Sequence, residues 1–307
     1  MEFSHLKYFI RASELNSISK AASEFNVATS VISSHISSLE RELGVQLFDR
    51  LGKTIQLNEI GHIVYRHALK ITDMMNDVCC EICDNNDSLE YTLLVSTLTI
   101  PKVVPFLVRG FQKQYPQIKL RMLQYQKAKD IRDMNCDIML YSSNEPISQN
   151  NSRTLYKEPI CLLAAKTHHL AQQKEVLPEQ LEEEYFIRSS DNSDFGQLTT
   201  AIFQRMDLSP RIAAITDYPS FALEMVACGM GIAFQPYLTW RFDLPSFKEK
   251  ITPIPVKGFD AVRYINITWN AERYYSKAMD HFIEYAIEFM RVLDQNQGDG
   301  LVRGDVL

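Results

Sequence analysis

No stretch of the 307-residue chain approaches the roughly 18 consecutive apolar residues that a membrane-spanning helix needs. The sequence also lacks a secretory signal peptide, because it begins with a charged segment of helical periodicity. We therefore expect a cytoplasmic protein without membrane partners. A chain of this length can bury a substantial core, and typical domain sizes predict two or three domains.

Cysteine is scarce, and the six cysteines are too scattered for a disulfide scaffold: Cys79, Cys80, Cys83, Cys136, Cys161 and Cys228. We expect them to be reduced. Cys80 and Cys83 have the Cys-x-x-Cys spacing, which can bind a metal or cycle as a dithiol. They fall on a continuous predicted helix with no second pair nearby, so the favoured interpretation is that they are small apolar side chains.

Motifs of the common enzyme classes are missing as well. The sequence contains no nucleophile elbow, no phosphate-binding loop and no paired metal-ligand motif. His168 and His169 are adjacent, but neighbouring side chains diverge in most backbones, so we do not expect a zinc site there. The sequence therefore predicts a protein that is not an enzyme and that holds no cofactor or metal.

Positive charge is also in deficit. Lys and Arg number 32 against 38 Asp and Glu, which gives a formal net charge of −6, and residues 1–60 carry six basic side chains against seven acidic ones. Phosphate neutralisation supplies much of the affinity of proteins for DNA. A DNA-binding domain in this segment should therefore bind weakly alone and depend on dimerisation.

The sequence does contain a helix–turn–helix pattern over residues 17–47. The turn falls at Asn26, because asparagine tolerates a left-handed backbone, and a second helix begins near Thr29. At about 100° per residue, one face of the second helix is apolar and consists of Ile32, Ile36, Leu39 and Leu43. The opposite face carries mostly short hydroxyl side chains: Ser30, Ser33, Ser34, Ser37 and Arg41.

The serine-rich face has two interpretations. Serine competes with the helix backbone for hydrogen bonds, so helix stability does not explain the pattern. The face is either merely solvated or enters the major groove of DNA, where hydroxyls meet base edges and phosphates. On the second interpretation, the candidate DNA contacts are Lys20, Thr29, Ser30, Ser33, Ser34 and Ser37.

Two further elements follow this pattern. Residues 45–57 alternate as a short hairpin, whose tip offers Arg50 and Lys53 as contacts of a wing with phosphates or the minor groove. Asn58 then caps a helix that runs to about Asp84. The helix has a heptad seam, which predicts a two-helix dimer interface: Ile60, Val64, His67, Ile71, Met74 and Val78.

Many separated positions in this region resemble the winged helix-turn-helix of LysR-type transcriptional regulators: Ala21, Ala22, Val27, Ile32, Ser33, Ile36, Leu39, Glu40, Glu42, Leu43, Gly44, Val45, Leu47, Phe48, Arg50, Leu57 and Gly61. The resemblance implies an N-terminal all-α winged helix-turn-helix domain over residues 1–58, with the helix-turn-helix at about 18–37. It also implies a long linker and dimerisation helix with a hinge over residues 59–87, and assembly as dimers or dimers of dimers.

The chain departs from the family pattern on the recognition helix. Where family members often have Gln-Pro at its start, this chain has Thr29 and Ser30, and where an Arg or other base-reading residue is common it has Ser34. Such a face should read DNA through fewer charge-assisted contacts. Operator sequence and affinity therefore do not transfer from other members.

After a predicted hinge at residues 85–88, strands and helices alternate, which is typical of a parallel or mixed sheet with flanking helices. We predict strands at residues 91–97, 118–124, 136–141, 160–165, 185–188, 211–215, 231–234 and 264–269, and helices at residues 101–114, 195–205, 220–228 and 272–293. The tail over residues 296–307 is expected to be disordered.

Further positions resemble the effector-binding domain of the LysR family, an α/β domain of two lobes that is similar to type II periplasmic binding proteins: Pro105, Phe111, Tyr115, Pro116, Asp137, Ile138, His169, Leu170 and residues 226–236. The resemblance implies an effector-binding domain over residues 88–295. Lobe one is expected at residues 91–163 plus 266–294, and lobe two at residues 164–265.

Small molecules bind such domains at the carboxyl ends of strands and at helix N-termini. The candidate effector contacts at these places are Ser96, Thr97, Leu98, Thr99, Tyr141, Ser142, Ser189, Ser190, Thr216 and Phe234. Hydroxyls and free backbone N–H groups favour an anionic or polar metabolite, although each Ser or Thr alone is equally well explained as a helix cap. Arg188 is the nearest candidate for pairing with a carboxylate.

The favoured function is a one-component transcription factor. A dimer binds an interrupted palindrome in double-stranded DNA, and an effector changes lobe closure and thereby the spacing of the DNA-binding domains. The alternative is a ligand-binding or sequestering protein in which the N-terminal unit only dimerises. The acidic N-terminal domain favours this alternative, whereas the missing signal peptide and the serine-lined helix oppose it.

Overall fold

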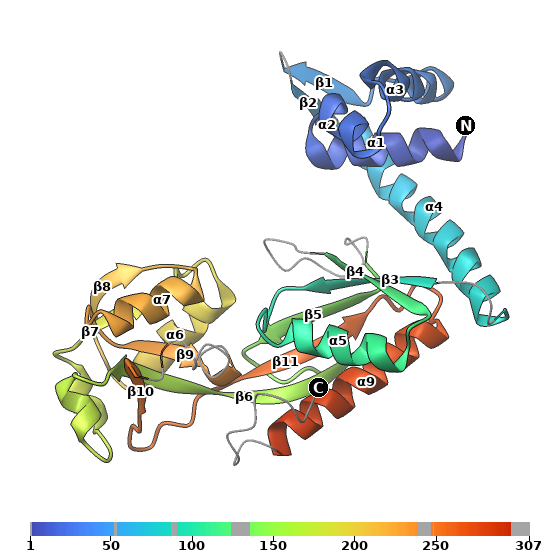
Figure 1. The fold of residues 1–307 in the computed structure, drawn as a ribbon. Helices are drawn as coiled ribbons and strands as arrows, with labels where there is room; N and C mark the ends of the chain where they lie inside the picture. Colours follow the sequence, from blue (N-terminus) through green and yellow to red (C-terminus); the bar gives the residue numbers. More distant parts are fainter. Residues whose placement is uncertain are drawn as a thin grey trace. The chain divides into compact units, whose positions relative to one another are not determined.

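The computed structural model describes residues 2–51, 54–86, 91–123, 136–238, 247 and 249–295. The chain forms two compact units (Figure 1). The first contains Met1–Leu89 and Glu272–Ser276, and the second contains most of the remaining chain. Three predictions fall outside the described residues: the contact by Lys53, the hinge at residues 87 and 88, and the tail over residues 296–307.

The first unit contains the predicted helix–turn–helix and hairpin. Its elements are α1 (Phe3–Leu15), α2 (Ile18–Glu24), α3 (Thr29–Leu43), β1 (Phe48–Leu51), β2 (Thr54–Leu57) and α4 (Glu59–Asp84). Asn26 has a left-handed backbone with φ of 54°, and Gly44 ends α3 with φ of 71°, as their residue types predict. The predicted apolar stripe of α3 is buried except for its last residue, Leu43, which is 42% exposed.

The start of α4 is fixed by two residues. Asn58 caps the helix as predicted, because its Oδ1 accepts a hydrogen bond of 2.7 Å from Gly61 N–H. A Cβ at Gly61 would lie 2.1 Å from the backbone oxygen of Leu47, so only glycine fits this close approach. The long helix is thereby anchored to the chain that enters the hairpin.

Helix α4 presents two different faces. Seven apolar side chains along one face are 38% to 68% exposed: Ile60, Ile63, Ile71, Met74, Met75, Val78 and Ile82. The predicted seam is therefore exposed for the most part, whereas Val64 packs against the core of the first unit. On another face, Asp73 and Asp77 pair with Arg273 at N–O distances of 3.5 and 3.1 Å.

The contact with Arg273 explains a boundary that the sequence pattern places wrongly. A helix is predicted from residue 272, but α9 (Lys277–Gln295) begins later. Glu272–Ser276 instead groups with the first unit, where the Arg273 side chain is 6% exposed and paired. A tertiary ion pair has overridden the local helical pattern.

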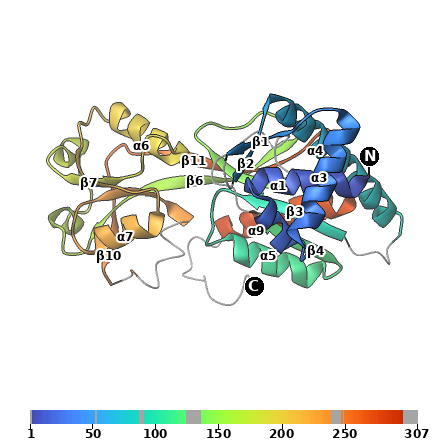
Figure 2. The same ribbon diagram turned by 90° about the horizontal axis from the view of Figure 1, so that it is seen from above.

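The second unit is built on a sheet with strand order β10-β6-β11-β5-β3-β4, in which β9 also pairs with β6, while β7 and β8 pair separately. The strands are β3 (Tyr91–Thr97), β4 (Ile118–Leu123), β5 (Ile138–Ser143), β6 (Ser152–Ala165), β7 (Tyr185–Arg188), β8 (Arg211–Ile215), β9 (Ala233–Pro236), β10 (Ile251–Ile254) and β11 (Val262–Trp269). Strand β6 pairs first with β11 and then with β9 and β10, so it runs through both lobes (Figure 2). This is the predicted two-lobe α/β architecture.

In lobe one, α5 (Val104–Gln114) and α9 pack against the same face of the sheet. Alternate residues of β3, β5 and β11 point to this face and are buried, as the period of two in a strand requires. The rings of Phe111 and Phe282 join the two helices at a centroid distance of 5.1 Å. The other face of the sheet carries buried polar side chains, among them Ser96 and Asn266.

In lobe two, α6 (Asp194–Arg205) and α7 (Pro219–Ala227) lie on opposite sides of the strands (Figure 2). Leu162 on β6 packs in the cluster of α6, and Leu163 packs in the cluster of α7. On β7, Phe186 likewise packs in the cluster of α6 and Ile187 in the cluster of α7. Because both faces are covered, these strands are nearly continuous apolar runs.

Other boundaries also differ from the predicted ones. Helix α5 begins at Val104 instead of residue 101, because Ile100 takes a left-handed φ of 44° and the chain turns before the helix starts. Strand β6 already begins at Ser152, and β10 was not predicted at all. Two 3-10 turns, His169–Gln172 and Pro178–Leu181, were also missed.

Candidate functional site

The N-terminal part of α3 is the candidate DNA-binding surface. Of the predicted contacts up to Ser37, Ser33 is half-buried. The other five are exposed: Lys20, Thr29, Ser30, Ser34 and Ser37. The residue before the helix is Ala28, which has no side-chain oxygen to cap the first N–H groups of α3. Those N–H groups and the neighbouring hydroxyls therefore form a polar surface suited to phosphate oxygens and base edges.

The acidic side chains of this unit are partly engaged within it. Arg11 binds Glu24 through two bonds of 2.5 and 2.7 Å and Glu14 through a third of 2.6 Å. These contacts, led by the hydrogen bond to Glu24, raise the pKa of Arg11. Glu40 accepts a bond of 2.8 Å from Leu47 N–H and so fixes the end of α3. The first turn of α3 contains no acidic side chain, so the slight acidic excess of residues 1–60 does not lie at the start of this helix.

The wing and the cysteines complete the first unit. The predicted hairpin is present, but the backbone of Arg50 lies within β1, opposite Ile55 of β2, whereas the prediction placed Arg50 at the hairpin tip. Cys80 is buried, and desolvation raises the pKa of the Cys83 thiol, with the neighbouring Cys79 and Asp84 raising it further. A raised pKa lowers the thiolate fraction of Cys83, and the interpretation of these cysteines as packing residues stays a prediction.

In lobe one, the candidate effector contacts lie at the carboxyl end of β3. The Ser96 side chain is fully buried and that of Thr99 is 5% exposed. Ser96 Oγ and Thr99 Oγ1 form no hydrogen bond with any part of the chain that the structure describes. Thr97 Oγ1 donates to Thr99 O at 2.9 Å, and Leu98 N–H donates to Leu140 O at 2.9 Å. Two buried hydroxyls are thus positioned by a backbone that is itself satisfied.

The neighbouring strand supplies the next two candidates. Tyr141 and Ser142 are both half-buried near the end of β5, and strand alternation places them on opposite faces of the sheet. Burial raises the pKa of Tyr141. After the strand, Asn144 Nδ2 lies 3.4 Å from the backbone oxygen of Asp194 at the start of α6. This contact brings the lobe-one candidates toward lobe two.

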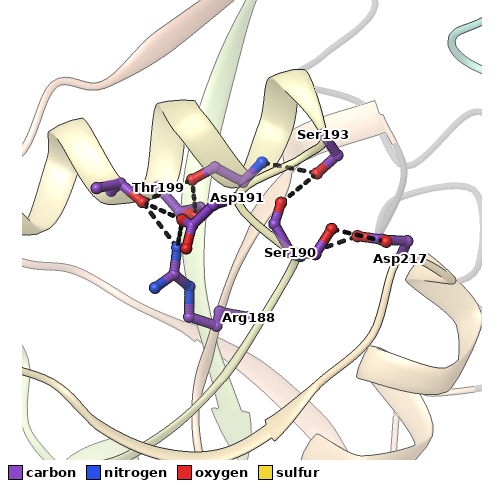
Figure 3. A network of polar contacts seen from close by, with 8 residues as sticks. Arg188, Ser190, Asp191, Ser193, Thr199 and Asp217 are labelled. Carbon is purple, nitrogen blue, oxygen red and sulfur yellow. Dashed lines mark hydrogen bonds and ion pairs between the residues drawn. The ribbon is translucent and has the colours of Figure 1, made fainter. Parts of the chain in front are cut away.

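In lobe two, a polar network surrounds the start of α6 (Figure 3). Ser190 donates from its backbone N–H and from its hydroxyl to the two carboxylate oxygens of Asp217, both at 2.9 Å. Ser193 Oγ donates to Ser190 O at 2.9 Å and accepts from Gly196 N–H at 3.0 Å. A Cβ on Gly196 would lie 1.8 Å from Ser190 O, so glycine permits this packing.

The same network holds Arg188. Its Nη2 donates to Thr200 Oγ1 at 2.7 Å and pairs with Asp191, and the hydrogen bond from Thr200 and the Arg188 charge lower the pKa of Asp191. Thr216 N–H donates to Arg188 O at 2.9 Å. The charge of Arg188 is therefore balanced within the protein, and the predicted N–H and hydroxyl donors of Ser190 are occupied by Asp217.

Two lobe-two candidates remain. Ser189 is half-buried beside Ser190, at the end of β7. Phe234 is 3% exposed, and its ring contacts the rings of Phe186, Phe203 and Phe259 at 5.8, 5.6 and 5.1 Å. The structure assigns Phe234 to the core, which differs from the predicted effector contact.

Sequence patterns missed a buried ion pair between the lobes. Glu158 on β6 is fully buried. Its carboxylate accepts a hydrogen bond of 2.6 Å from Arg263 Nε on β11 and one of 2.7 Å from Leu238 N–H. The Arg263 guanidinium also lies 5.9 Å from the centre of the Phe195 ring at the start of α6. No local motif marks this pair, because its members are 105 residues apart.

The expectation that His168 and His169 diverge is wrong. Their rings stack with centroids 4.6 Å apart, and both Nε2 atoms face Glu184, at 3.2 and 2.9 Å. Leu170 N–H donates to His168 Nδ1 at 3.3 Å and orients that ring. The turn at the start of His169–Gln172 brings the two side chains to one carboxylate.

Family comparisons cover nearly the whole chain. Residues 3–62 match the bacterial regulatory helix-turn-helix protein, lysR family, and residues 85–291 match the LysR substrate binding domain. The chain belongs to the LysR family of transcriptional regulators. The two matches together describe a DNA-binding regulator with an effector-binding domain.

Individual relatives of this LysR-family regulator match over most of their length. The uncharacterized HTH-type transcriptional regulator YybE of Bacillus subtilis is 27% identical over 295 residues, which are 94% of this chain and 98% of YybE. The transcriptional dual regulator GltC of the same species is 27% identical over 307 residues, covering 97% and 100% of the two chains.

Solved structures share the fold. A full-length OxyR variant from Pseudomonas aeruginosa has a TM-score of 0.71 at 19% identity and covers 95% of each chain. CbnR in complex with its target DNA has a TM-score of 0.66 at 19% identity, covering 94% of this chain and 99% of CbnR. In the part of the chain that the structure describes, no helix is long and apolar enough to cross a membrane.

Proposed function

We propose that this LysR-family regulator reads its operator with the N-terminal face of α3 and steadies itself on the DNA backbone with the hairpin wing. Two observations support this proposal. Ala28 leaves the N–H groups in the first turn of α3 without a side-chain cap. The hydroxyls on the same helix are exposed: Thr29, Ser30, Ser34 and Ser37. Lys20, Ser33, Arg50 and Lys53 are the supporting contacts. The exposed face of α4 pairs two subunits, so that the dimer spans an interrupted palindrome in double-stranded DNA.

A DNA titration separates reading from anchoring. Replacing Thr29 and Ser30 together by Ala should cost about 1–3 kcal/mol on the specific site and little on random DNA, because hydroxyls at base edges are lost. Lys53→Ala should weaken both DNAs alike and reduce the salt slope by about one, because one phosphate contact is lost. The readout is fluorescence anisotropy on the protein's own upstream DNA and on a scrambled duplex. Equal losses for both variants on both DNAs would contradict the assigned face.

We further propose that a small polar metabolite binds between the hydroxyls of Ser96 and Thr99 in lobe one and the network around Ser190 and Asp217 in lobe two. The two unbonded, buried hydroxyls support this position, because burying a polar group without a partner is costly unless a ligand completes it. Asp217 occupies the donors of Ser190, so an effector that bears hydrogen-bond donors suits this side better than a bare anion. Tyr141, Ser142, Thr97, Leu98, Ser189 and Thr216 flank this position.

Ser96→Ala tests the effector position, because it should change the melting temperature differently with and without ligand. Because Ser96 Oγ bonds to no described group, its removal should leave the melting temperature unchanged or raise it in the absence of ligand. A panel of amino acids, organic acids and nucleosides should contain compounds that raise the melting temperature of the wild type. Ser96→Ala should abolish that rise, whereas Thr92→Val, an exposed position on the same strand, should preserve it. A rise that survives in Ser96→Ala would place the effector elsewhere.

The sequestering alternative is not favoured, since the relatives of the chain are transcriptional regulators and one structural neighbour is bound to its target DNA. We propose that the protein acts in the cytoplasm as a regulator without catalytic activity. Footprinting on the protein's own upstream DNA tests this function directly, because a sequestering protein would leave no protected site at a salt concentration where the wild type binds.

A further inference from the structure

The strongest unassigned cluster of side chains is the group formed by His168, His169 and Glu184. His168 and Glu184 have side chains 15% and 13% exposed, whereas His169 is 67% exposed. One donor atom from each residue lies within 4.8 Å of the other two. The group thus has a buried side, which fixes two ligands, and an open side toward solvent.

The three ligand atoms lie close enough together for one metal ion to bind all of them after small shifts of the side chains. Zinc binds imidazole nitrogen and carboxylate oxygen at about 2.0–2.2 Å, which places neighbouring ligands about 3.3 Å apart in a tetrahedron. The Nε2 atoms of His168 and His169 lie 3.2 and 2.9 Å from the two oxygens of Glu184. Two imidazoles and one carboxylate are ligands that suit zinc and cobalt, whereas Mg²⁺ and Ca²⁺ prefer oxygen alone.

We propose that His168, His169 and Glu184 bind one divalent transition-metal ion of the Zn²⁺ class, with the exposed side of His169 leaving a fourth position to water. Binding at Nε2 of His168 moves the imidazole proton to Nδ1, so the long bond of 3.3 Å from Leu170 N–H is exchanged for the metal bond. The ion ties the turn after β6 to the residue that precedes β7. It therefore stabilises lobe two independently of DNA binding and of the effector.

Zinc titration of the full chain tests the site. After treatment with a chelator, the wild type should take up one equivalent of Zn²⁺ in competition with a chromophoric chelator. His169→Ala and Glu184→Gln should each weaken this equivalent at least about tenfold, since each removes a ligand. His62→Ala removes an exposed histidine of α4 and should bind like the wild type. Wild-type protein without a zinc equivalent, or equal binding by all variants, would overturn the proposal.

Two controls test whether a loss of zinc binding comes from misfolding of the variant, and whether the cysteines bind the metal instead. His168 still contacts Glu184 in His169→Ala, so the metal-free melting temperature of this variant should stay close to that of the wild type, and the rise on adding Zn²⁺ should be lost. Co²⁺ in place of Zn²⁺ should give the visible spectrum of a tetrahedral nitrogen and oxygen site, unchanged in a Cys79→Ser, Cys83→Ser double variant. A thiolate-to-cobalt charge-transfer band that disappears in that double variant would assign the metal to the cysteines and overturn the proposal.

Discussion

A Met74→Glu, Val78→Glu double variant is expected to be monomeric and to lose operator binding. The two side chains are 68% and 51% exposed in the single chain and lie on the apolar face of α4. Burial of a Met or Val side chain contributes about 1.5–3 kcal/mol. Two such losses in each subunit should raise the dimer dissociation constant at least about a thousandfold, and unpaired carboxylates in the interface raise it further.

Loss of the dimer should remove more DNA affinity than any single DNA contact. Residues 1–60 have no excess of basic side chains, so one subunit gains little from phosphate neutralisation. Pairing two binding units adds about 10²–10⁴ in affinity through effective concentration. The double variant should therefore bind operator DNA about 10² to 10⁴ times more weakly than the wild type, because each monomer binds with one DNA-binding domain only. Light scattering after size-exclusion chromatography and anisotropy titrations measure the two effects on the same sample.

Asn76→Glu is the matched control for this experiment. It adds a carboxylate in the same turns of α4, but about 200° around the helix from Met74 and away from the apolar face. The variant should remain dimeric and keep its DNA affinity. If it dissociates as the double variant does, charge on α4 and not loss of the apolar face explains the result. A double variant that stays dimeric would exclude this face as the interface.

Local signals carried most of the prediction for the first unit. Asn26, Gly44 and Asn58 each specify a backbone conformation or cap by their own chemistry, so the turn and two helix ends follow from neighbouring residues alone. The start of α9 did not follow, because Arg273 is held by Asp73 and Asp77 from a distant part of the chain. Boundaries set by tertiary ion pairs leave no periodic trace in the sequence.

The effector residues show the same division. The position of Ser96 and Thr99 at a strand end followed from the β–α pattern, whereas the occupation of Ser190 by Asp217 joins residues 27 apart and required the fold. The placement of Phe234 in the core was missed because a strand with both faces buried gives no alternation to show which side faces a ligand. His168 and His169 were misjudged from adjacency alone, since the turn that follows them aligns their rings.

Arg263→Leu is expected to destabilise the second unit by about 3–5 kcal/mol. The variant leaves the carboxylate of Glu158 fully buried, with the N–H of Leu238 at 2.7 Å as its remaining partner in the described structure. An uncompensated buried charge costs that much, whereas removal of both charges is often nearly neutral. A Glu158→Gln, Arg263→Leu double variant should therefore recover most of the loss, because glutamine keeps an acceptor for Leu238 N–H. Guanidinium unfolding of the full chain, followed by circular dichroism, measures both.

The exposed pair of Arg205 and Asp260 provides the comparison. Its bond of 2.8 Å is close to the 2.6 Å of the buried pair, but the two side chains are 56% and 84% exposed. Arg205→Leu should cost less than about 1 kcal/mol, since water screens the pair. Equal costs for Arg205→Leu and Arg263→Leu would contradict the role assigned to burial.

The position of Glu158 gives this ion pair a consequence beyond stability. Glu158 lies where β6 stops pairing with β11 and begins to pair with β9, and its carboxylate is hydrogen-bonded to Arg263 of β11 and to Leu238 in the chain after β9. These are the segments that pass between the lobes, so the pair holds them in one register. The Glu158→Gln, Arg263→Leu variant should fold, yet show a smaller melting-temperature rise with any compound that stabilises the wild type, because the lobes no longer present their effector contacts in one fixed arrangement.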